Sequence, residues 1–333
     1  MASNEELDQD ISVEIKKYQD KIDLAKKELS KIFVGQEDMI NSLFEALISN
    51  GHVLIEGIPG IGKTILVRAL AEITGCDYSR IQFTPDLLPT DIIGITTYDQ
   101  KKGFQTIKGP VFTNFLLGDE INRSPPKVQS ALLEAMAEKQ VTIGTKSYKL
   151  EDPFFVMATQ NPLEQLGTYQ LPEAQLDRFL FKTIMRYPNN AEELLILDTN
   201  LNTKSFSDFG LKKILSKKEI IDSQKLASKI TVEQKVKKYI VRLIDATRRP
   251  ENYKLEHAKY ISFGASPRAS IGLYVASKAK ALIKGKTYVT QEDVKEVAYN
   301  VLRHRIIVNF EGQAEDINTD MIINELLAKV KLL

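Results

Sequence analysis

The sequence contains a single cysteine, Cys76, among its 333 residues, so no disulfide can form within the chain. One free thiol fits a reducing compartment. Histidine is also scarce, and the three histidines, His52, His257 and His304, are scattered without the spacing that metal ligands show. The sequence therefore indicates neither a disulfide-stabilised secreted domain nor a metal centre built from histidine and cysteine.

The chain also lacks an excess of charge of either sign. Its 45 basic and 44 acidic residues leave a net charge of +1, which argues against the basic field that drives non-specific nucleic-acid binding. No apolar run reaches the roughly 18–20 residues that a membrane span needs. The first ten residues, MASNEELDQD, are polar and acidic, unlike a signal peptide. We expect a soluble, cytoplasmic protein with no membrane segment.

What the sequence does contain is an alternation of buried strands and helices, which ends near residue 188. Residues 34–188 are predicted to form an α/β core with a mainly parallel sheet, because short apolar runs are separated by helical segments. Residues 189–333 show helical periodicity almost throughout and are predicted to form a smaller all-helical domain. Residues 1–33 are predicted as an amphipathic helix. The four apolar runs with strand character are HVLIE (52–56), FLLGDE (115–120), FFVMATQN (154–161) and FLFKTIM (179–185).

The stretch GIPGIGKT matches the phosphate-loop (Walker A) pattern G-x-x-x-x-G-K-[ST], with a strand before it and a helix after it. Its glycines allow turns that aim backbone N–H groups at phosphate oxygens. Lys63 is expected to reach the β- and γ-phosphates and Thr64 to coordinate Mg²⁺. A glycine-rich turn that binds nothing is the alternative. The predicted nucleotide-binding residues of this loop are Gly57, Ile58, Pro59, Gly60, Ile61, Gly62, Lys63, Thr64 and Ile65.

A pair of carboxylates, Asp119 and Glu120, ends the second strand (Walker B). Ligands of α/β proteins bind at the carboxyl edge of the sheet, where this pair is expected. Asp119 would hold Mg²⁺, and Glu120 is suited to act as the general base for an attacking water. A phosphate loop alone does not distinguish kinases, GTPases and motors, but two carboxylates at this place favour hydrolysis over transfer to a small molecule.

Together, GIPGIGKT, LLGDEINRSPPKVQSALLEAMAE, ATQNP and LPEAQLDRF resemble the MoxR family of AAA+ ATPases, in the helix-2-insert branch. FTPDLLPTDIIG (83–94) and VLRHRI (301–306) fit the same family. The similarity covers the chain from about Val34 to Arg305. The resemblance implies a P-loop AAA+ core followed by a helical lid.

The resemblance also implies roles for residues outside the phosphate loop. Asn161 in ATQNP resembles sensor 1, Arg178 in LDRF the arginine finger that reaches a neighbour's ATP, and Arg268 in GASPRA sensor 2. The alternatives are a turn asparagine, a surface salt bridge and a lid-surface arginine, respectively. Gly35 and Gln36 resemble the segment that contacts adenine.

Two segments match the inserts of this branch: the irregular stretch 84–110, and the alternating stretch 140–150, which reads as a β-hairpin. In related proteins such inserts face a central pore or a client. Surface decoration is the alternative for both.

The function that the resemblance implies is an oligomeric ATPase, expected as a hexameric ring, that acts as a chaperone in the maturation of protein complexes, including metal or cofactor insertion. Its expected partners are further copies of itself, a von Willebrand factor A domain protein and a client protein. The alternatives are the ATPase subunit of a metal chelatase, a nucleic-acid motor of the same branch, and a nucleotide-dependent switch with negligible turnover. A nucleic-acid partner is not expected, since the chain has no basic arm or zinc module.

Overall fold

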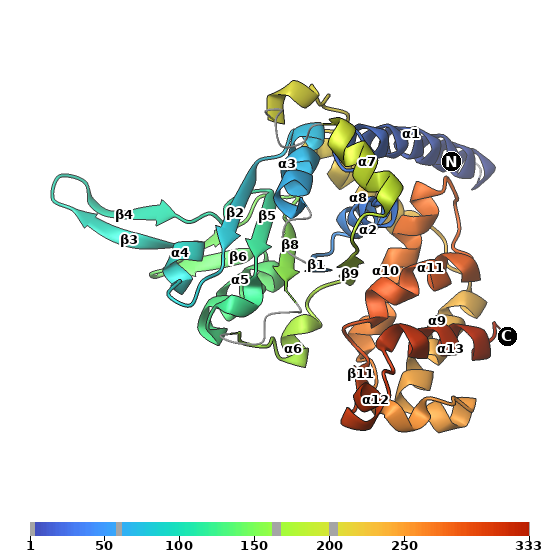
Figure 1. Cartoon of the computed structure of the whole chain (residues 1–333). Helices are drawn as coiled ribbons and strands as arrows, with labels where there is room; N and C mark the ends of the chain where they lie inside the picture. Colours follow the sequence, from blue (N-terminus) through green and yellow to red (C-terminus); the bar gives the residue numbers. More distant parts are fainter. Residues whose placement is uncertain (1–3, 58–61, 162–167, 200–205, 333) are drawn as a thin grey trace.

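A five-stranded parallel sheet with the order β2-β5-β8-β1-β9 forms the centre of the first half of the protein. This computed structural model describes residues 4–57, 62–161, 168–199 and 206–332 (Figure 1). The sheet confirms the predicted α/β fold class, and four of its strands lie where apolar runs predicted them. The strands are β1 (Val53–Gly57), β2 (Tyr78–Gln82), β5 (Phe115–Asp119), β8 (Phe155–Gln160) and β9 (Phe181–Met185).

Alternate residues of each strand face opposite sides of the sheet and enter two different apolar cores. In β1, Val53 and Ile55 belong to a core shared with α2 (Glu37–Ile48) and α3 (Lys63–Thr74). Leu54 belongs to a second core with α5 (Pro126–Glu138). Coverage of both faces explains why the central strands are continuous apolar runs.

The second half of the chain is helical, as predicted, apart from a small antiparallel pair formed by β10 (Ile261–Phe263) and β11 (Ile307–Val308). Local signals set the helix ends: Ser216 with Glu219 and Thr290 with Asp293 form capping boxes at the starts of two helices. The helices of this region are α7 (Asn190–Thr199), α8 (Lys217–Lys229), α9 (Gln234–Arg248), α10 (Pro267–Ile283), α11 (Gln291–Leu302), α12 (Phe310–Ala314) and α13 (Thr319–Lys329).

The N-terminal helix α1 (Asn4–Leu29) packs on the chain's own body, against α3, α2, α8 and α10. Its buried face contains Ile15, Tyr18, Ile22 and Leu29, at the spacing of an amphipathic helix. The helix thus bridges the α/β core and the helical region (Figure 1). Among the helices of the described ranges, none is long and apolar enough to cross a membrane.

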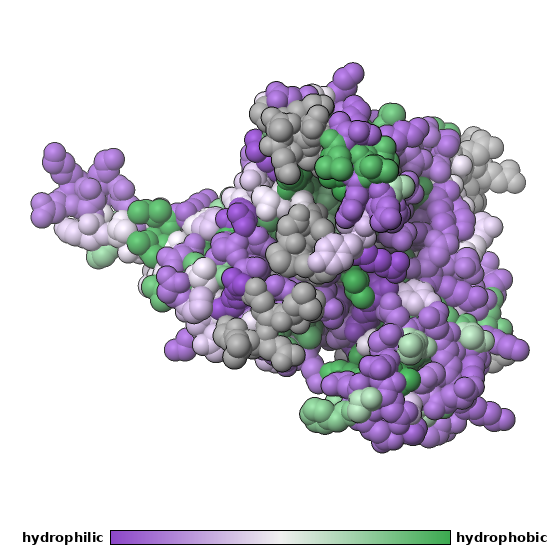
Figure 2. All heavy atoms as spheres, in the orientation of Figure 1, coloured by the Kyte–Doolittle hydropathy of each residue, from purple (hydrophilic) through white to green (hydrophobic). Residues whose placement is uncertain are grey.

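The stretch 84–110, expected to be irregular, instead contains a short helix, α4 (Pro89–Ile93), and an antiparallel hairpin of β3 (Gly94–Asp99) and β4 (Gly103–Lys108). The hairpin projects from the body (Figure 1), and its end is hydrophilic (Figure 2). The predicted 140–150 hairpin is confirmed as β6 (Gln140–Ile143) and β7 (Lys146–Lys149). Tyr98 and Phe104 are exposed near the end of the longer hairpin and stack edge to face at 5.2 Å.

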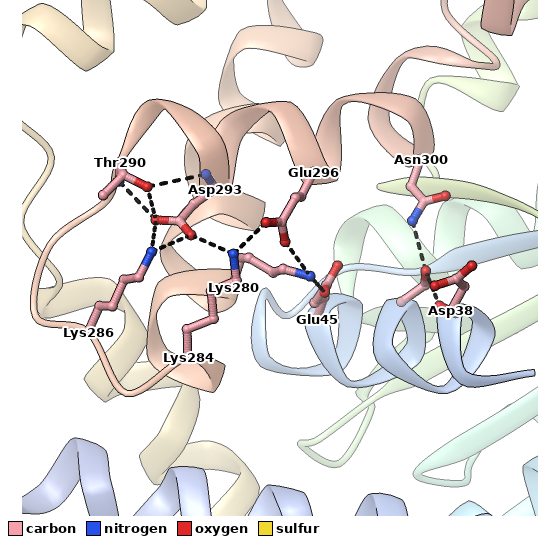
Figure 3. Close-up of polar contacts among 10 residues, drawn as sticks. Asp38, Glu45, Lys280, Lys284, Lys286, Thr290, Asp293, Glu296 and Asn300 are labelled. Carbon is pink, nitrogen blue, oxygen red and sulfur yellow. Dashed lines mark hydrogen bonds and ion pairs between the residues drawn. The ribbon is translucent and has the colours of Figure 1, made fainter.

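A network of ion pairs joins α2 of the core to α10 and α11 (Figure 3). The Glu45 carboxylate, only 3% exposed, lies 2.8 Å from the Lys280 ammonium. Lys280 also pairs with Glu296 at 3.0 Å, and Lys284 joins Glu296 to Asp293. Burial raises the pKa of Glu45, which Lys280 opposes. Burial alone would lower the pKa of Lys280, but Glu45 and Glu296 raise it above its ordinary value.

Lys280→Ala is expected to lower the free energy of unfolding by about 3 kcal/mol, because it leaves the Glu45 charge buried without its partner. Glu45→Gln should cost only about 1 kcal/mol, since Lys280 keeps Glu296. The deficit of Lys280→Ala should shrink as the pH falls through the raised pKa of Glu45, because the protonated acid carries no buried charge. Urea unfolding of both variants and of the double variant measures this. Equal losses in the two single variants would contradict it.

Candidate functional site

An open pocket of about 440 Å³ lies at the carboxyl edge of the sheet, where β1, β5 and β8 end. It is lined by Gly62, Lys63, Thr64, Ile65, Arg80, Gln82, Asp119, Glu120 and Asn161. The fold therefore gathers the end of the phosphate loop, both carboxylates and Asn161 around one space. This edge is where ligands of open α/β sheets bind.

The phosphate loop leaves β1 at Gly57 and enters α3 at Lys63. Gly62 has φ +81°, a left-handed conformation that side chains disfavour, which accounts for a glycine at this position. Lys63 Nζ donates to the Gly57 carbonyl at 2.6 Å. Burial lowers the pKa of the Lys63 ammonium, and the Asp119 and Glu120 carboxylates oppose that shift. The predicted residues Ile58, Pro59, Gly60 and Ile61 lie outside the described residues.

Asp119 has both carboxylate oxygens engaged. Oδ1 accepts from Thr159 Oγ1 at 2.7 Å, and Oδ2 accepts from the Arg80 guanidinium at 2.7 Å. Thr64 lines the same pocket, so a hydroxyl and a carboxylate, oxygen ligands of the kind Mg²⁺ prefers, face one space. These residues fit the predicted Mg²⁺ site.

Glu120 is held in an uncommon backbone conformation, with φ +57°. Its N–H donates to Thr159 Oγ1 at 2.8 Å, which stabilises this turn of the chain. Its carboxylate accepts from Gln82 Nε2 at 2.8 Å and pairs with Arg123 at 3.0 Å. Residues that their surroundings hold in an uncommon backbone conformation are often found at functional sites. The arrangement keeps the Glu120 carboxylate beside the pocket.

Three residues of this site were not predicted: Arg80, Gln82 and Thr159. Arg80 and Gln82 both contact the carboxylates, whereas Ile81 between them is buried in the core. This period of two is the signal of a half-buried strand and could have revealed them, had β2 been recognised. Asn161 follows β8, is buried, and lines the pocket as its predicted role requires.

Arg178 and Arg268 lie near the amino ends of the sheet strands, whereas Lys63 lies at their carboxyl ends. Strands β1 and β9 are parallel, with Val53 beside Phe181 and Gly57 beside Met185. Arg178 precedes β9, so five residues of strand, about 16 Å, separate its end of the sheet from the phosphate loop. Arg268, at the start of α10, lies 3.7 Å from Asp177.

The two arginines have different surroundings. Arg178 is exposed, follows the short helix α6 (Glu173–Leu176), donates to the Leu133 carbonyl at 2.7 Å and lines a separate hollow of about 470 Å³ beside α5. The Arg268 side chain is 61% exposed. Neither belongs to the pocket that Lys63 lines.

Asp177 connects this edge to the helical region. Its carboxylate accepts from Arg305 Nε and from Ser266 Oγ, each at 2.7 Å. The nearly buried Arg305 guanidinium also donates to the carbonyls of Phe179 and Leu180. Arg178 lies within this clamped segment, so its position depends on α10 and α11.

Gly35 and Gln36 line a different hollow, of about 740 Å³, between α2, the end of β9 and α11. Gln36 Nε2 donates to the Arg186 carbonyl at 2.8 Å. Neither residue lines the pocket of Lys63, so their contact with adenine stays a prediction.

The chain is similar to known proteins along most of its length. Residues 52–181 match the ATPase family associated with various cellular activities (AAA), and residues 254–326 match the AAA lid domain. The chain is 46% identical over 307 residues to Chaperone MoxR1 of Mycobacterium tuberculosis, covering 92% of this chain and 80% of that protein. It is 30% identical over 312 residues to Protein MoxR of Methylorubrum extorquens, covering 89% and 91%. A solved structure from Cytophaga hutchinsonii superposes with a TM-score of 0.90 at 47% identity, covering 98% of both chains.

Proposed function

Because the chain belongs to the MoxR family of AAA ATPases, we propose that it is an ATP-hydrolysing chaperone that remodels or matures protein complexes, with each ATP bound between two subunits. The observation that carries the proposal is the separation of the site into two halves. The phosphate-loop lysine and both carboxylates lie at the carboxyl ends of the strands, and Arg178 and Arg268 lie at the amino ends.

Within one subunit, the Lys63 ammonium, which donates to the Gly57 carbonyl in this structure, donates charge-assisted hydrogen bonds to the phosphates. Glu120 takes the proton of the attacking water, and Asn161 orients that water. Thr64 and Asp119 would hold Mg²⁺, which neutralises charge on the phosphoryl oxygens. The proposal is supported by the pocket, which all of these side chains line.

The other half of each site comes from a neighbouring copy. In a ring, the edge that presents Arg178 meets the pocket of the next subunit, and the same contact delivers Arg268. This arrangement supports a homo-oligomer, which we propose is a hexameric ring, because no single chain completes its own site. Gly35 and Gln36 are proposed to contact the adenine.

The inserts and the helical lid are proposed to transmit the movement driven by ATP hydrolysis to the client. Arg305, which follows α11, binds Asp177 next to Arg178, so a change at the nucleotide of the neighbouring subunit can move the lid. The exposed Tyr98 and Phe104 of the long hairpin provide an apolar contact for a client. The proposed partners are a client protein and a von Willebrand factor A domain protein, and metal or cofactor insertion is one form that this maturation takes.

The proposal is tested by trapping complexes on the Glu120→Gln protein, which is expected to hold ATP without turning it over. Pull-down with ATP should recover a von Willebrand factor A domain protein with its complex, equally with and without nuclease. The Lys63→Ala protein should recover neither, because the loss of a charge-assisted phosphate contact weakens ATP binding about 10–150-fold.

Two other outcomes would each favour an alternative. Nuclease-sensitive recovery of replication or repair proteins would indicate a nucleic-acid motor. Recovery of a porphyrin-metallating complex would indicate a chelatase subunit. Equal recovery by Glu120→Gln and Lys63→Ala would show that the interaction does not depend on bound ATP, which would contradict the proposal.

A further inference from the structure

Strand β2 directs a cation at the carboxylate predicted to hold Mg²⁺. A single nitrogen of the Arg80 guanidinium, Nη2, lies 2.7 Å from Asp119 Oδ2 and 2.7 Å from Gln82 Oε1. The Gln82 amide in turn donates to Glu120 at 2.8 Å. Arg80 is therefore held between the metal-binding carboxylate and the residue that contacts the general base.

The contact fixes the charge balance of the pocket. The Asp119 side chain is only 15% exposed, and its other oxygen accepts from the neutral Thr159 hydroxyl. Arg80 is 43% exposed and is a lining residue of the same pocket as Lys63 and Thr64. A partly buried carboxylate needs a nearby cation, and the contact with Arg80 supplies one.

Mg²⁺ held by Asp119 would share this carboxylate with Arg80, because Oδ2 of Asp119 already accepts from the guanidinium. Two cations beside one carboxylate repel each other, so binding of one favours release of the other. The exposure of Arg80 leaves its guanidinium room to swing towards solvent, whereas Asp119 is fixed at the end of β5.

We propose that Arg80 is the counter-cation of Asp119, which Mg²⁺ displaces when the metal–nucleotide complex binds. Arg80 is a positioning residue: it orients the Asp119 carboxylate, and it lowers the affinity of the site for Mg²⁺. This inference rests on the proposed ATPase function. It goes beyond that function because it assigns to a β2 residue the control of metal affinity.

The competing explanation is that Arg80 binds a phosphate of the nucleotide directly. The two explanations predict different effects of removing Arg80 on Mg²⁺ and nucleotide binding. A counter-cation opposes Mg²⁺, so its removal tightens Mg²⁺ binding and weakens nucleotide binding when Mg²⁺ is absent. A phosphate ligand helps the nucleotide under both conditions, so its removal weakens binding with and without Mg²⁺.

The test is calorimetric titration of ADP into wild-type and Arg80→Ala protein, once with Mg²⁺ and once with EDTA, followed by titration of Mg²⁺ into each ADP complex. For Arg80→Ala we expect the ADP dissociation constant in EDTA to rise about 3–10-fold, because the Asp119 charge is uncompensated. The Mg²⁺ dissociation constant of the ADP complex should fall by a similar factor.

Controls separate this effect from general damage. Arg80→Lys should restore values near wild type, because the charge is retained. Arg249→Ala removes an arginine of another Arg–Asp pair, in the helical region, and should change neither constant. Arg80→Gln provides a second neutral variant, and thermal unfolding midpoints verify that each protein is folded.

An unchanged or weaker Mg²⁺ affinity in both neutral variants would overturn the inference. If the wild-type protein bound no ADP under either condition, the proposed ATPase function itself would fail. These two failures are therefore distinguishable in one set of titrations.

Discussion

Arg178→Ala is expected to lower ATP turnover by about 10³–10⁵-fold while leaving ATP affinity nearly unchanged, the effect of losing an arginine finger. The reason is geometric: Arg178 lies at the amino end of the strands, away from the Lys63 pocket of its own chain. We therefore expect it to contribute little to binding by that chain and to act on the nucleotide of its neighbour. Steady-state ATPase assays and nucleotide titration measure the two quantities separately.

Mixing variants tests whether the finger works between subunits. In a mixed oligomer of Arg178→Ala and Lys63→Ala chains, an intact pocket from the first can meet an intact Arg178 from the second. Turnover should therefore return when two inactive proteins are combined. Arg242→Ala, which removes a half-buried arginine that also donates to a backbone carbonyl, should remain active on its own. Failure of rescue in a verified mixed oligomer would contradict the inter-subunit arrangement.

Glu120→Gln is expected to bind ATP with near wild-type affinity and to turn it over about 10²–10⁴-fold more slowly, the range for loss of a general base. The amide keeps the size of the side chain and can still contact Gln82 and Arg123, but it cannot accept the proton of water. Burst and steady-state phosphate release, with ATP affinity measured in parallel, separate binding from chemistry.

A matched control for this variant is Glu72→Gln, an exposed change on α3 outside the pocket, which should retain full turnover. If Glu120→Gln also retained near-normal turnover, another group would have to serve as the base.

Much of the fold was predictable because its signals are local. The strands β1, β5, β8 and β9 appear as apolar runs, since helices cover both faces of the sheet. Strand β2 was missed because it lies at the sheet edge and buries only Ile81. The β3–β4 hairpin was missed for a related reason: most of its residues are exposed, so no alternating burial marks its strands.

The site divides in the same way. Lys63 was recognisable from the phosphate-loop pattern, and Asp119, Glu120 and Asn161 from their place at the ends of apolar strands, which meet at one edge of a parallel sheet. The contact of Arg80 with Asp119 was not recognisable, because it joins residues 39 positions apart and depends on the register of β2 against β5.

The sequence by itself determined the α/β class, the helical lid, the phosphate loop and the carboxylate pair, since these follow from the order and period of neighbouring residues. Only the tertiary structure decided that α1 packs on its own core, that Arg80 contacts Asp119, and that Arg178 and Arg268 lie away from their own pocket. The Arg305 clamp on Asp177 joins residues 128 positions apart. Such contacts are set by how strands pair and helices pack, and no local pattern encodes them.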